Sequence, residues 1–292
     1  MSQSYTTVKT IWGLGLEASR RPGGVYSPKL YSTVNEAMSI PSDASLRTPS
    51  DDNNKPELNV LMIGRGGHRN AIGGSSDSLT DTLTPRINAV TLFEAMPFLA
   101  IPVSGGTVPA GINIDDFCLE KTETYSGVQY KCYYGMFLNT SATGTDVTIQ
   151  EITVDPIDRS ISKKAYEFDS ALQLNPTPLT LSTGSTNNAT NVYLEVSTPF
   201  KLTFSADLVT AIMAASSIAH GDDLRYSVIS EMAICYSVKE TVPGTNWGTQ
   251  SFTTEALWCS PFTFISTYNK LQYQTSGFSY NFALGQSLPY RT

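Results

Sequence analysis

The side chains of this chain that could do acid–base chemistry are few and lie far apart in the sequence. His68 and His220 are the only histidines among 292 residues, which limits general acid–base catalysis near neutral pH. His220 stands in the sequence Ala219-His-Gly-Asp-Asp223, which is typical of a helix end. Because the C-terminus of a helix attracts a cation, we expect His220 to cap that helix.

A glycine-rich run from Gly64 to Gly74 follows a predicted strand, as phosphate-binding loops do. Its spacing fits neither nucleotide-binding pattern. The dinucleotide fingerprint needs a glycine where Arg69 stands, and Gly-Lys-Ser/Thr occurs nowhere in the chain. We therefore interpret the run as a flexible or interface loop that uses the positive φ angles open to glycine. Arg65, His68 and Arg69 leave an anion site as the alternative.

The remaining candidates for catalysis and metal binding do not form a recognisable site. No Gly-x-Ser-x-Gly sequence is present, and the adjacent acids at 115–116 and 222–223 are typical of caps and turns. No two cysteines form the Cys-x-x-Cys pair of zinc ribbons, so we expect reduced thiols at Cys118, Cys132, Cys235 and Cys259. The sequence thus predicts no enzyme, no catalytic residue, no cofactor and no metal.

The composition favours a protein that is covered by other proteins. Charged residues make up only 15% of the chain, and uncharged polar groups cost less than charges to bury at an interface. An ordinary threonine-rich β protein is the alternative. A net charge of −7 argues against an extended nucleic-acid contact. The N-terminus lacks the features of a secretory signal and no apolar run is long enough to span a membrane. We expect synthesis in the cytoplasm, no membrane partner and no small-molecule substrate.

The hydrophobic patterns predict a mostly β fold. Residues 1–56 are rich in proline and glycine yet too apolar for a solvated tail, so we expect an extended N-terminal arm that docks on its own body or on a neighbouring subunit. Two β subdomains are predicted at 57–160 and 161–292, and the first contains a long Gly/Ser-rich loop at 65–86. The dipeptide Ser126-Gly127 predicts a hairpin. Many strands with one helix favour an antiparallel β-sandwich or barrel.

Two further local signals are strong. Apolar residues at helical spacing, with Asp207 as N-cap and Gly221 just past the end, predict one short helix at about 207–219. Alternation from Leu224 to Val238 predicts a strand with one apolar face and one mostly polar face, on which Glu231 lies.

Two segments look like phage tail or baseplate sequence: Pro85-Arg-Ile-Asn-Ala-Val-Thr-Leu-Phe-Glu-Ala-Met-Pro-Phe98 and Tyr125-Ser-Gly-Val-Gln-Tyr-Lys-Cys-Tyr-Tyr134. With its apolar arm, Ser/Thr-rich β body and low charge, the whole chain resembles the small structural proteins of tailed-bacteriophage virions. The resemblance implies a location in the virion, and assembly with copies of itself and other virion proteins into a symmetric ring or layer of the tail, baseplate or neck. The candidate assembly contacts are Trp12, Leu14, Tyr31, Arg65 and Arg69.

A second class of function stays open, namely a carbohydrate- or receptor-binding β-sandwich in which aromatic rings stack on sugars. Tyr133, Trp247 and Trp258 are the available ring platforms. The two hypotheses differ in exposure. A sugar site needs aromatic rings on an open concave surface, whereas assembly buries apolar arms and loops between chains.

Overall fold

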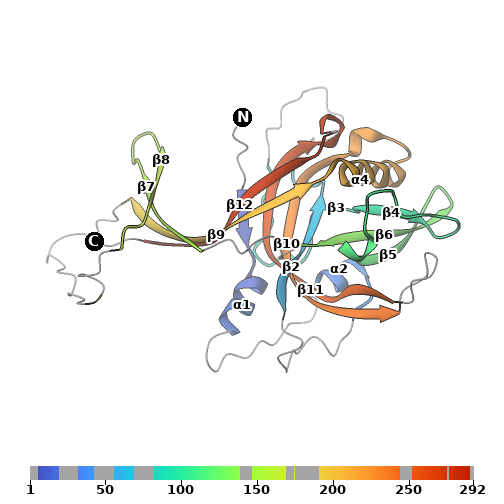
Figure 1. Ribbon diagram of the computed structural model, residues 1–292, viewed down its shortest axis with the longest axis horizontal. Coiled ribbons are helices and arrows are strands. Elements are labelled where there is room, and N and C mark those ends of the chain that lie inside the picture. Colours follow the sequence, from blue (N-terminus) through green and yellow to red (C-terminus); the bar gives the residue numbers. More distant parts are fainter. Residues whose placement is uncertain are drawn as a thin grey trace. The chain divides into compact units, whose positions relative to one another are not determined.

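The computed structural model describes residues 6–19, 32–42, 56–68, 82–138, 147–168, 174, 191–243, 252–274 and 276–289. These residues form two mainly antiparallel β-sheets and a short helix near the predicted position, which confirms the mostly β fold class (Figure 1). The chain divides into two compact units. Unit 1 comprises Met1–Thr140 and Phe204–Phe278, and unit 2 comprises Ser141–Thr203 and Ser279–Thr292. The units differ from the predicted subdomains because the C-terminal strand pairs within unit 2.

Unit 1 contains an eight-stranded sheet in the order β1-β11-β10-β2-β6-β4, with β3 paired to β2 and β5 paired to β6. Its strands are β1 (Thr6–Lys9), β2 (Glu57–Gly64), β3 (Ala95–Met96), β4 (Leu99–Pro102), β5 (Phe117–Tyr125), β6 (Val128–Phe137), β10 (Val228–Pro243) and β11 (Phe252–Lys270). Long-range pairs dominate. Ile63 pairs with Met232, and Thr7 pairs with Ile265. The sheet is therefore assembled from segments near both ends of the chain.

Strand β10 differs from its prediction at its start and on its second face. A 3₁₀ helix, η4 (Leu224–Tyr226), precedes it because the Asp223 side chain accepts the Arg225 backbone N–H at 2.9 Å and caps this turn. From Ser227 to Val238 every residue is buried. Both faces of β10 are therefore covered over this stretch, and the polar face predicted for the strand does not face solvent.

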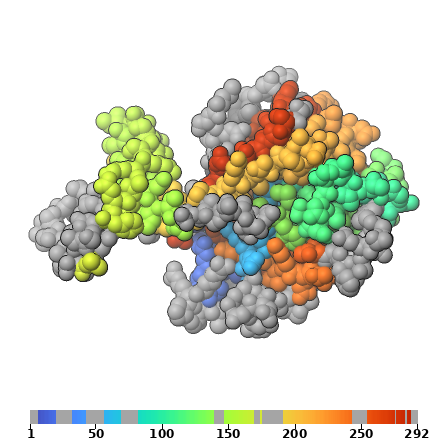
Figure 2. Space-filling view, in the orientation of Figure 1, coloured from blue at the N-terminus to red at the C-terminus, as the bar shows by residue number. Residues whose placement is uncertain are grey.

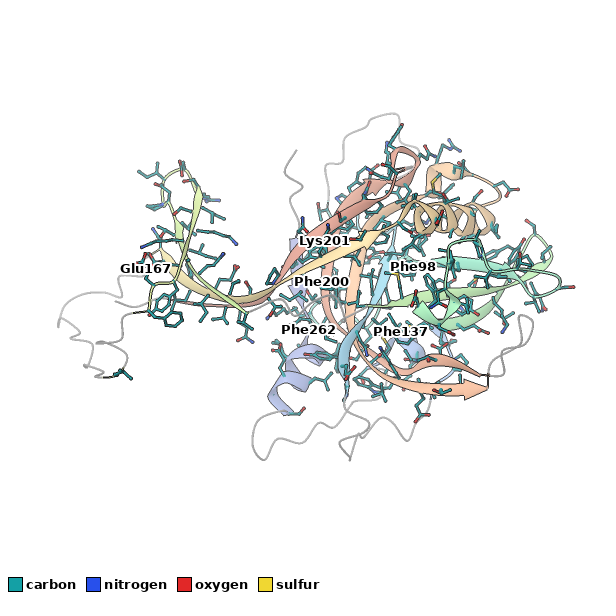
Figure 3. The ribbon with its side chains drawn as sticks, viewed as in Figure 1. Phe98, Phe137, Glu167, Phe200, Lys201 and Phe262 are labelled. Carbon is teal, nitrogen blue, oxygen red and sulfur yellow. The ribbon has the colours of Figure 1, made fainter. Side chains whose placement is uncertain are left out.

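The core of unit 1 is formed by side chains from most strands of its sheet (Figure 3). The four cysteines all lie in one buried cluster and are unoxidised, as predicted: Cys118, Cys132, Cys235 and Cys259. Phe98, just before β4, is fully buried, and Phe137 on β6 packs against the cluster. The aromatic and thiol side chains thus contribute to the hydrophobic core.

Helix α4 (Ala206–Ala219) lies within one residue of the predicted helix. Its N-cap is Ser205 rather than Asp207, since the Ser205 hydroxyl accepts the Leu208 backbone N–H at 3.2 Å. At the other end His220 is the C-cap, as predicted, and Gly221 follows with a φ of 64°. Two further 3₁₀ helices are η3 (Ile114–Asp116) and η5 (Leu271–Tyr273). Across the described ranges, no helix is both long and apolar enough to cross a membrane.

The described parts of residues 1–56 pack on the body of unit 1. Strand β1 pairs with β11, and helices α1 (Ile11–Ser19) and α2 (Val34–Met38) follow it. Gly13 lies so close to Phe262 that a Cβ would be 2.6 Å from its ring. The segment is thus not extended throughout, because a proline-free apolar stretch coils against β11. These described residues dock on the body of their own chain, which is the first of the two predicted alternatives.

The predicted long loop at 65–86 is closed at its base. His68 forms an isolated β-bridge with Thr82, and the Leu83 N–H donates to the Gly67 carbonyl at 2.8 Å. The part of the loop between these pairs lies outside the described residues. The two ends of the loop therefore leave the body side by side.

Unit 2 contains a four-stranded sheet in the order β12-β9-β7-β8. Its strands are β7 (Thr148–Val154), β8 (Ile161–Ala165), β9 (Val192–Phe204) and β12 (Phe278–Pro289). A turn joins β7 to β8, in which the Asp155 carboxylate accepts the Ile157 N–H at 2.7 Å. The subdomain boundary predicted at 160 thus falls within a single hairpin.

Candidate functional site

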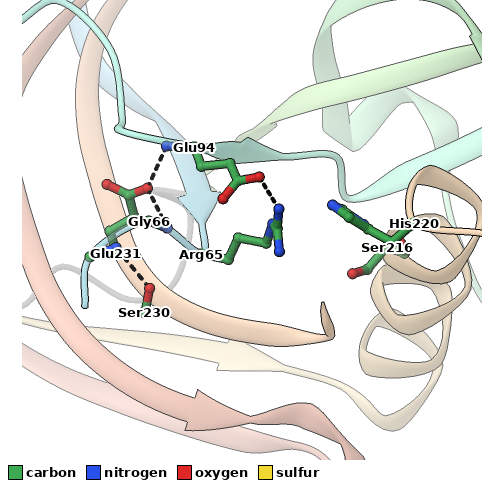
Figure 4. A network of polar contacts seen from close by, with 8 residues as sticks. Arg65, Gly66, Glu94, Ser216, His220, Ser230 and Glu231 are labelled. Atoms are coloured by element: carbon green, nitrogen blue, oxygen red, sulfur yellow. Dashed lines mark hydrogen bonds and ion pairs between the residues drawn. The ribbon is translucent and has the colours of Figure 1, made fainter. Parts of the chain in front are cut away.

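A buried carboxylate with several backbone partners in unit 1 is that of Glu231, near the start of β10 (Figure 4). The residue is 2% exposed. Its carboxylate accepts the backbone N–H of Gly66 at 2.9 Å, of Phe93 at 3.0 Å and of Glu94 at 2.8 Å. One buried carboxylate therefore joins the segment after β2 to the segment before β3. We call this arrangement the Glu231 junction.

The glycines of the run from Gly64 serve the Glu231 junction by allowing close approach. A Cβ on Gly67 would lie 2.2 Å from the Ser230 carbonyl oxygen, and a Cβ on Gly66 would lie 2.6 Å from the Phe93 side chain. The Gly67 N–H also donates to the Ser230 hydroxyl at 2.9 Å. The first part of the run is thus held against β10, and the interpretation as a flexible loop is wrong for these residues.

Arg65 is turned toward the interior of unit 1. Its guanidinium pairs with Glu94 and lies 4.6 Å above the centre of the Tyr226 ring. Tyr226 in turn stacks on the His220 imidazole, with centroids 4.5 Å apart and planes 9° apart, and His220 Nδ1 lies 2.7 Å from the Ser216 carbonyl oxygen. The Arg65 side chain is only 11% exposed. Its contacts are therefore with its own chain.

Burial sets the electrostatics of this region. It raises the pKa of the Glu231 carboxyl above its usual value, and the three N–H groups oppose that shift only in part. Burial also lowers the pKa of His68, whose Nε2 lies 3.3 Å from the Thr82 hydroxyl. The Glu231 carboxylate has its partners inside the protein and is closed to a substrate, so the arrangement fixes the backbone.

A second carboxylate repeats this arrangement between two other strands. Glu255 on β11 accepts the N–H of Leu119 at 2.5 Å and of Glu120 at 3.2 Å, both on β5, and the N–H of Ala256 at 2.8 Å. Burial raises the pKa of the Glu255 carboxyl as well. Because β5 is hydrogen-bonded to β6 rather than to β11, this contact closes the sheet on itself.

The sequence contains a signal for the internal position of Glu231. Glu231 is the only charged residue from Ser227 to Val238, in a run that is otherwise apolar or carries small hydroxyls. A lone acid in such a strand needs internal hydrogen bonds if the strand is central. The alternation of apolar and polar residues alone predicts that Glu231 lies on the solvent-facing side of the strand.

The predicted assembly contacts fall in different environments. The Trp12 indole N–H donates to the carbonyls of Asn88 at 3.2 Å and Ala89 at 3.1 Å, so Trp12 fastens α1 to its own body. Leu14, two residues on, is 46% exposed. Tyr31 and Arg69 lie outside the described residues. Of the three candidates that the structure describes, Trp12, Leu14 and Arg65, Leu14 is the one that is open to a partner.

The aromatic residues considered as sugar platforms are not exposed where they are described. Tyr133 is 4% exposed and Trp258 is 1% exposed. Trp247 lies outside the described residues. Ring stacking on a sugar at Tyr133 or Trp258 would need a rearrangement of the core.

Metal-binding clusters and similarity to known proteins were two further possible indications of function. In the part of the chain that the structure describes, no three His, Cys, Asp or Glu side chains are placed to hold a metal ion. No curated protein and no solved structure shows significant similarity to the chain. A family model described as "Family of unknown function (DUF7208)" matches residues 1–292. The chain belongs to the DUF7208 family.

Proposed function

We propose that this chain is a non-enzymatic structural protein of a tailed-bacteriophage virion, which assembles into a symmetric ring or layer of the tail, baseplate or neck. Its partners are copies of itself and other virion proteins. Low charge and the resemblance of the sequence support the proposal. The structural observation that carries it is the apolar outer side of helix α1.

Helix α1 has nine residues, of which only Glu17 is charged. Its inner side contributes Gly13 and Leu16 to the body, where both are buried. Its outer side presents Ile11 and Leu14, which are 41% and 46% exposed. A surface helix normally carries polar residues on its outer side, so α1 has the composition of a helix that is covered on both sides.

The apolar outer side of α1 continues onto a neighbouring segment. The Ile11 N–H donates to the Ile87 carbonyl at 2.9 Å, and the Ile87 side chain is 59% exposed. Atoms of α1 reach the surface in the space-filling view (Figure 2, dark blue). Covering apolar area yields about 25 cal/mol per Å², which a neighbouring subunit would gain here. We define Ile11, Leu14 and Ile87 as the α1 surface.

Quantitative mass spectrometry of purified virions tests the proposed function. A small fixed copy number relative to the major capsid protein is expected for a component of the tail, baseplate or neck. Complete absence of the chain from virions would overturn the proposal.

A matched pair of substitutions tests the α1 surface. Leu14 and Leu224 are 46% and 45% exposed, so Leu14→Glu and Leu224→Glu introduce the same charge at similar exposure. We expect L14E to lower incorporation into virions about tenfold, the equivalent of about 1.4 kcal/mol, and L224E to leave it unchanged. Thermal unfolding of both purified variants controls for loss of folding. Equal incorporation of the two would contradict the role of the α1 surface.

Deletion of residues 1–34 is a less informative test than these substitutions. It would remove Leu16, which is buried in one cluster with Trp258 and Phe262, and Val34, which is fully buried. The truncated chain is therefore expected to lose stability as well as any assembly contact.

A further inference from the structure

We infer that part of unit 2 opens locally while unit 1 stays folded, so that the chain contains a segment that loses and regains its order without global unfolding. The segment consists of β7 (Thr148–Val154), β8 (Ile161–Ala165) and residues 192–197 of β9, and we call it the β7–β9 segment. The inference concerns the chain alone and does not depend on the proposed function.

Two strands of similar length show how the units differ in burial. β2 has eight residues and lies between β10 and β6, and β7 has seven residues and lies between β9 and β8. Both strands are hydrogen-bonded to neighbours on both edges. Six residues of β2 are buried, whereas Ile152 is the one buried residue of β7. Because removal of apolar side chains from water is the dominant favourable term in folding, we expect β7 to be held much more weakly than β2.

The apolar side chains of the β7–β9 segment are divided between two sides of the sheet. Val154 pairs with Ile161, which is 63% exposed, and Ile149 pairs with Val196, which is 37% exposed. Since Ile149 and Val154 are an odd number of positions apart along β7, these two pairs lie on opposite sides. Apolar side chains therefore reach solvent on both sides of the described strands, and neither side is a fully covered core.

The edge of the β7–β9 segment is open as well. β8 is the last strand in the sheet order, and all five of its residues are exposed. Lys164 on β8 pairs with Glu167 at 3.0 Å, but both side chains are exposed to water, where an ion pair contributes little to stability. The described contacts of β8 are thus mainly its backbone hydrogen bonds to β7.

Burial increases toward the residues of unit 2 that adjoin unit 1 in the sequence. Leu202, near the end of β9, is 4% exposed, and Tyr280, near the start of β12, is 1% exposed. Among residues 192–197 of β9, by contrast, Ser197 is the buried one. A few strands without a buried hydrophobic face are only marginally stable in water. We therefore expect opening to include the β7–β9 segment and to stop before Leu202.

Local opening would make the β7–β9 segment a conformational element of its own. Regions with few buried apolar residues open at low free energy, and the elements of proteins that move or become ordered on binding are drawn from such regions. The β7–β9 segment can thus change its order without disrupting the sheet of unit 1.

Native-state amide hydrogen exchange of the full chain, read by mass spectrometry, tests the inference. After correction for the intrinsic exchange rate of each amide, the amides of β7 are expected to exchange at least about 100-fold faster than those of β2. Equal protection of the two strands would overturn the inference.

Two substitutions test whether the opening is local. Ile152→Ala removes the buried side chain of β7, so we expect it to speed exchange in β7 about tenfold. Ile63→Val destabilises unit 1, because Ile63 is fully buried in β2. It should speed exchange in β2 about fivefold and change exchange in β7 less than about twofold. Circular dichroism controls for the folding of both variants.

The response of β7 to the substitution in β2 decides between local and global opening. If I63V speeds exchange equally in β2 and β7, the chain opens as one unit and the inference is wrong. Exchange in β7 that does not respond to I152A would also overturn it.

Discussion

Glu255 on β11 accepts the backbone N–H of Leu119 on β5, and Leu119 has a left-handed φ of 58°. A leucine in this conformation costs about 1–2 kcal/mol, because its Cβ crowds the following carbonyl oxygen. The same carboxylate accepts the N–H groups of Glu120 and Ala256. Glu255 thus compensates for strain in β5 while it holds that strand against β11.

Loss of the Glu255 carboxylate should be costly, because it leaves three backbone N–H groups without their acceptor. We expect Glu255→Ala to lower the free energy of unfolding by about 3 kcal/mol, measured by urea denaturation. Glu57→Ala is the control, since Glu57 is exposed at the start of β2, and should change it by less than about 0.5 kcal/mol. Equal effects would show that Glu255 is not a structural acceptor.

The stability of the chain should depend on pH through the carboxyl groups of Glu231 and Glu255. Burial raises the pKa of both Glu231 and Glu255, so the folded state binds these protons more tightly than the unfolded state. Their stabilising contribution is complete below the ordinary glutamate pKa of about 4.3 and is lost as pH rises through the folded-state values. The unfolding free energy of the wild type minus that of the E231Q/E255Q variant should therefore decrease as the pH rises above about 4.

Chemical denaturation at several pH values measures this difference. Subtracting the variant cancels groups whose pKa is lowered, such as Asp223, where hydrogen bonds from Arg225 hold the pKa of the carboxyl below its usual value. Curves that run parallel for the two proteins would contradict the prediction.

Substitution of Gly67 should show the cost of close backbone approach at the Glu231 junction. A Cβ there would lie 2.2 Å from the Ser230 carbonyl oxygen, so we expect Gly67→Ala to destabilise the chain by about 3 kcal/mol. Gly105→Ala is the matched control, because Gly105 has a φ of 72° but nothing within 4 Å of a Cβ. It should cost about 1 kcal/mol from backbone strain alone. Thermal unfolding distinguishes the two, and a tolerated G67A would refute the packing argument.

The four thiols should be unreactive in the folded protein. All are buried, and burial raises the pKa of Cys132 to about 12 and also raises the pKa of Cys118 and Cys259. Thiolate is the reactive form, so a disulfide reagent at mildly alkaline pH should react slowly with the native chain and with four thiols after unfolding in urea. Rapid reaction of any thiol in the native state would contradict the prediction.

The parts of the fold that could be predicted from the sequence are those encoded locally. Ser126 and Gly127 have positive φ angles of 49° and 82° and join β5 to β6, as a two-residue hairpin turn requires. Helix α4 follows its apolar spacing, and Gly221 adopts the left-handed conformation expected past a helix end. Each signal lies within a few residues of the element that it specifies.

The parts of the fold that could not be predicted depend on contacts between segments that are far apart in the sequence. A single sequence does not show which distant segments pair. The C-terminal strand β12 pairs with β9 rather than completing unit 1, so the boundary between units does not follow chain order. At the α1 surface, the apolar pattern of α1 does not distinguish buried Leu16 from exposed Leu14, because the helix is apolar on both sides. An arginine is usually exposed, and the sequence alone does not reveal that Arg65 pairs with Glu94 and lies over the Tyr226 ring.

The pairing of β2 with β10 has a consequence for the synthesis of this chain. Ile63 is made 169 residues before Met232, with which it pairs. At roughly 5–20 residues per second, a ribosome takes roughly 8–34 seconds to supply that partner. During this interval the apolar run of β2 has an unpaired edge that can pair with other nascent chains. We therefore expect the yield of folded chain to depend on this delay, and to respond to translation rate and to chaperones more than to the stability of the finished sheet.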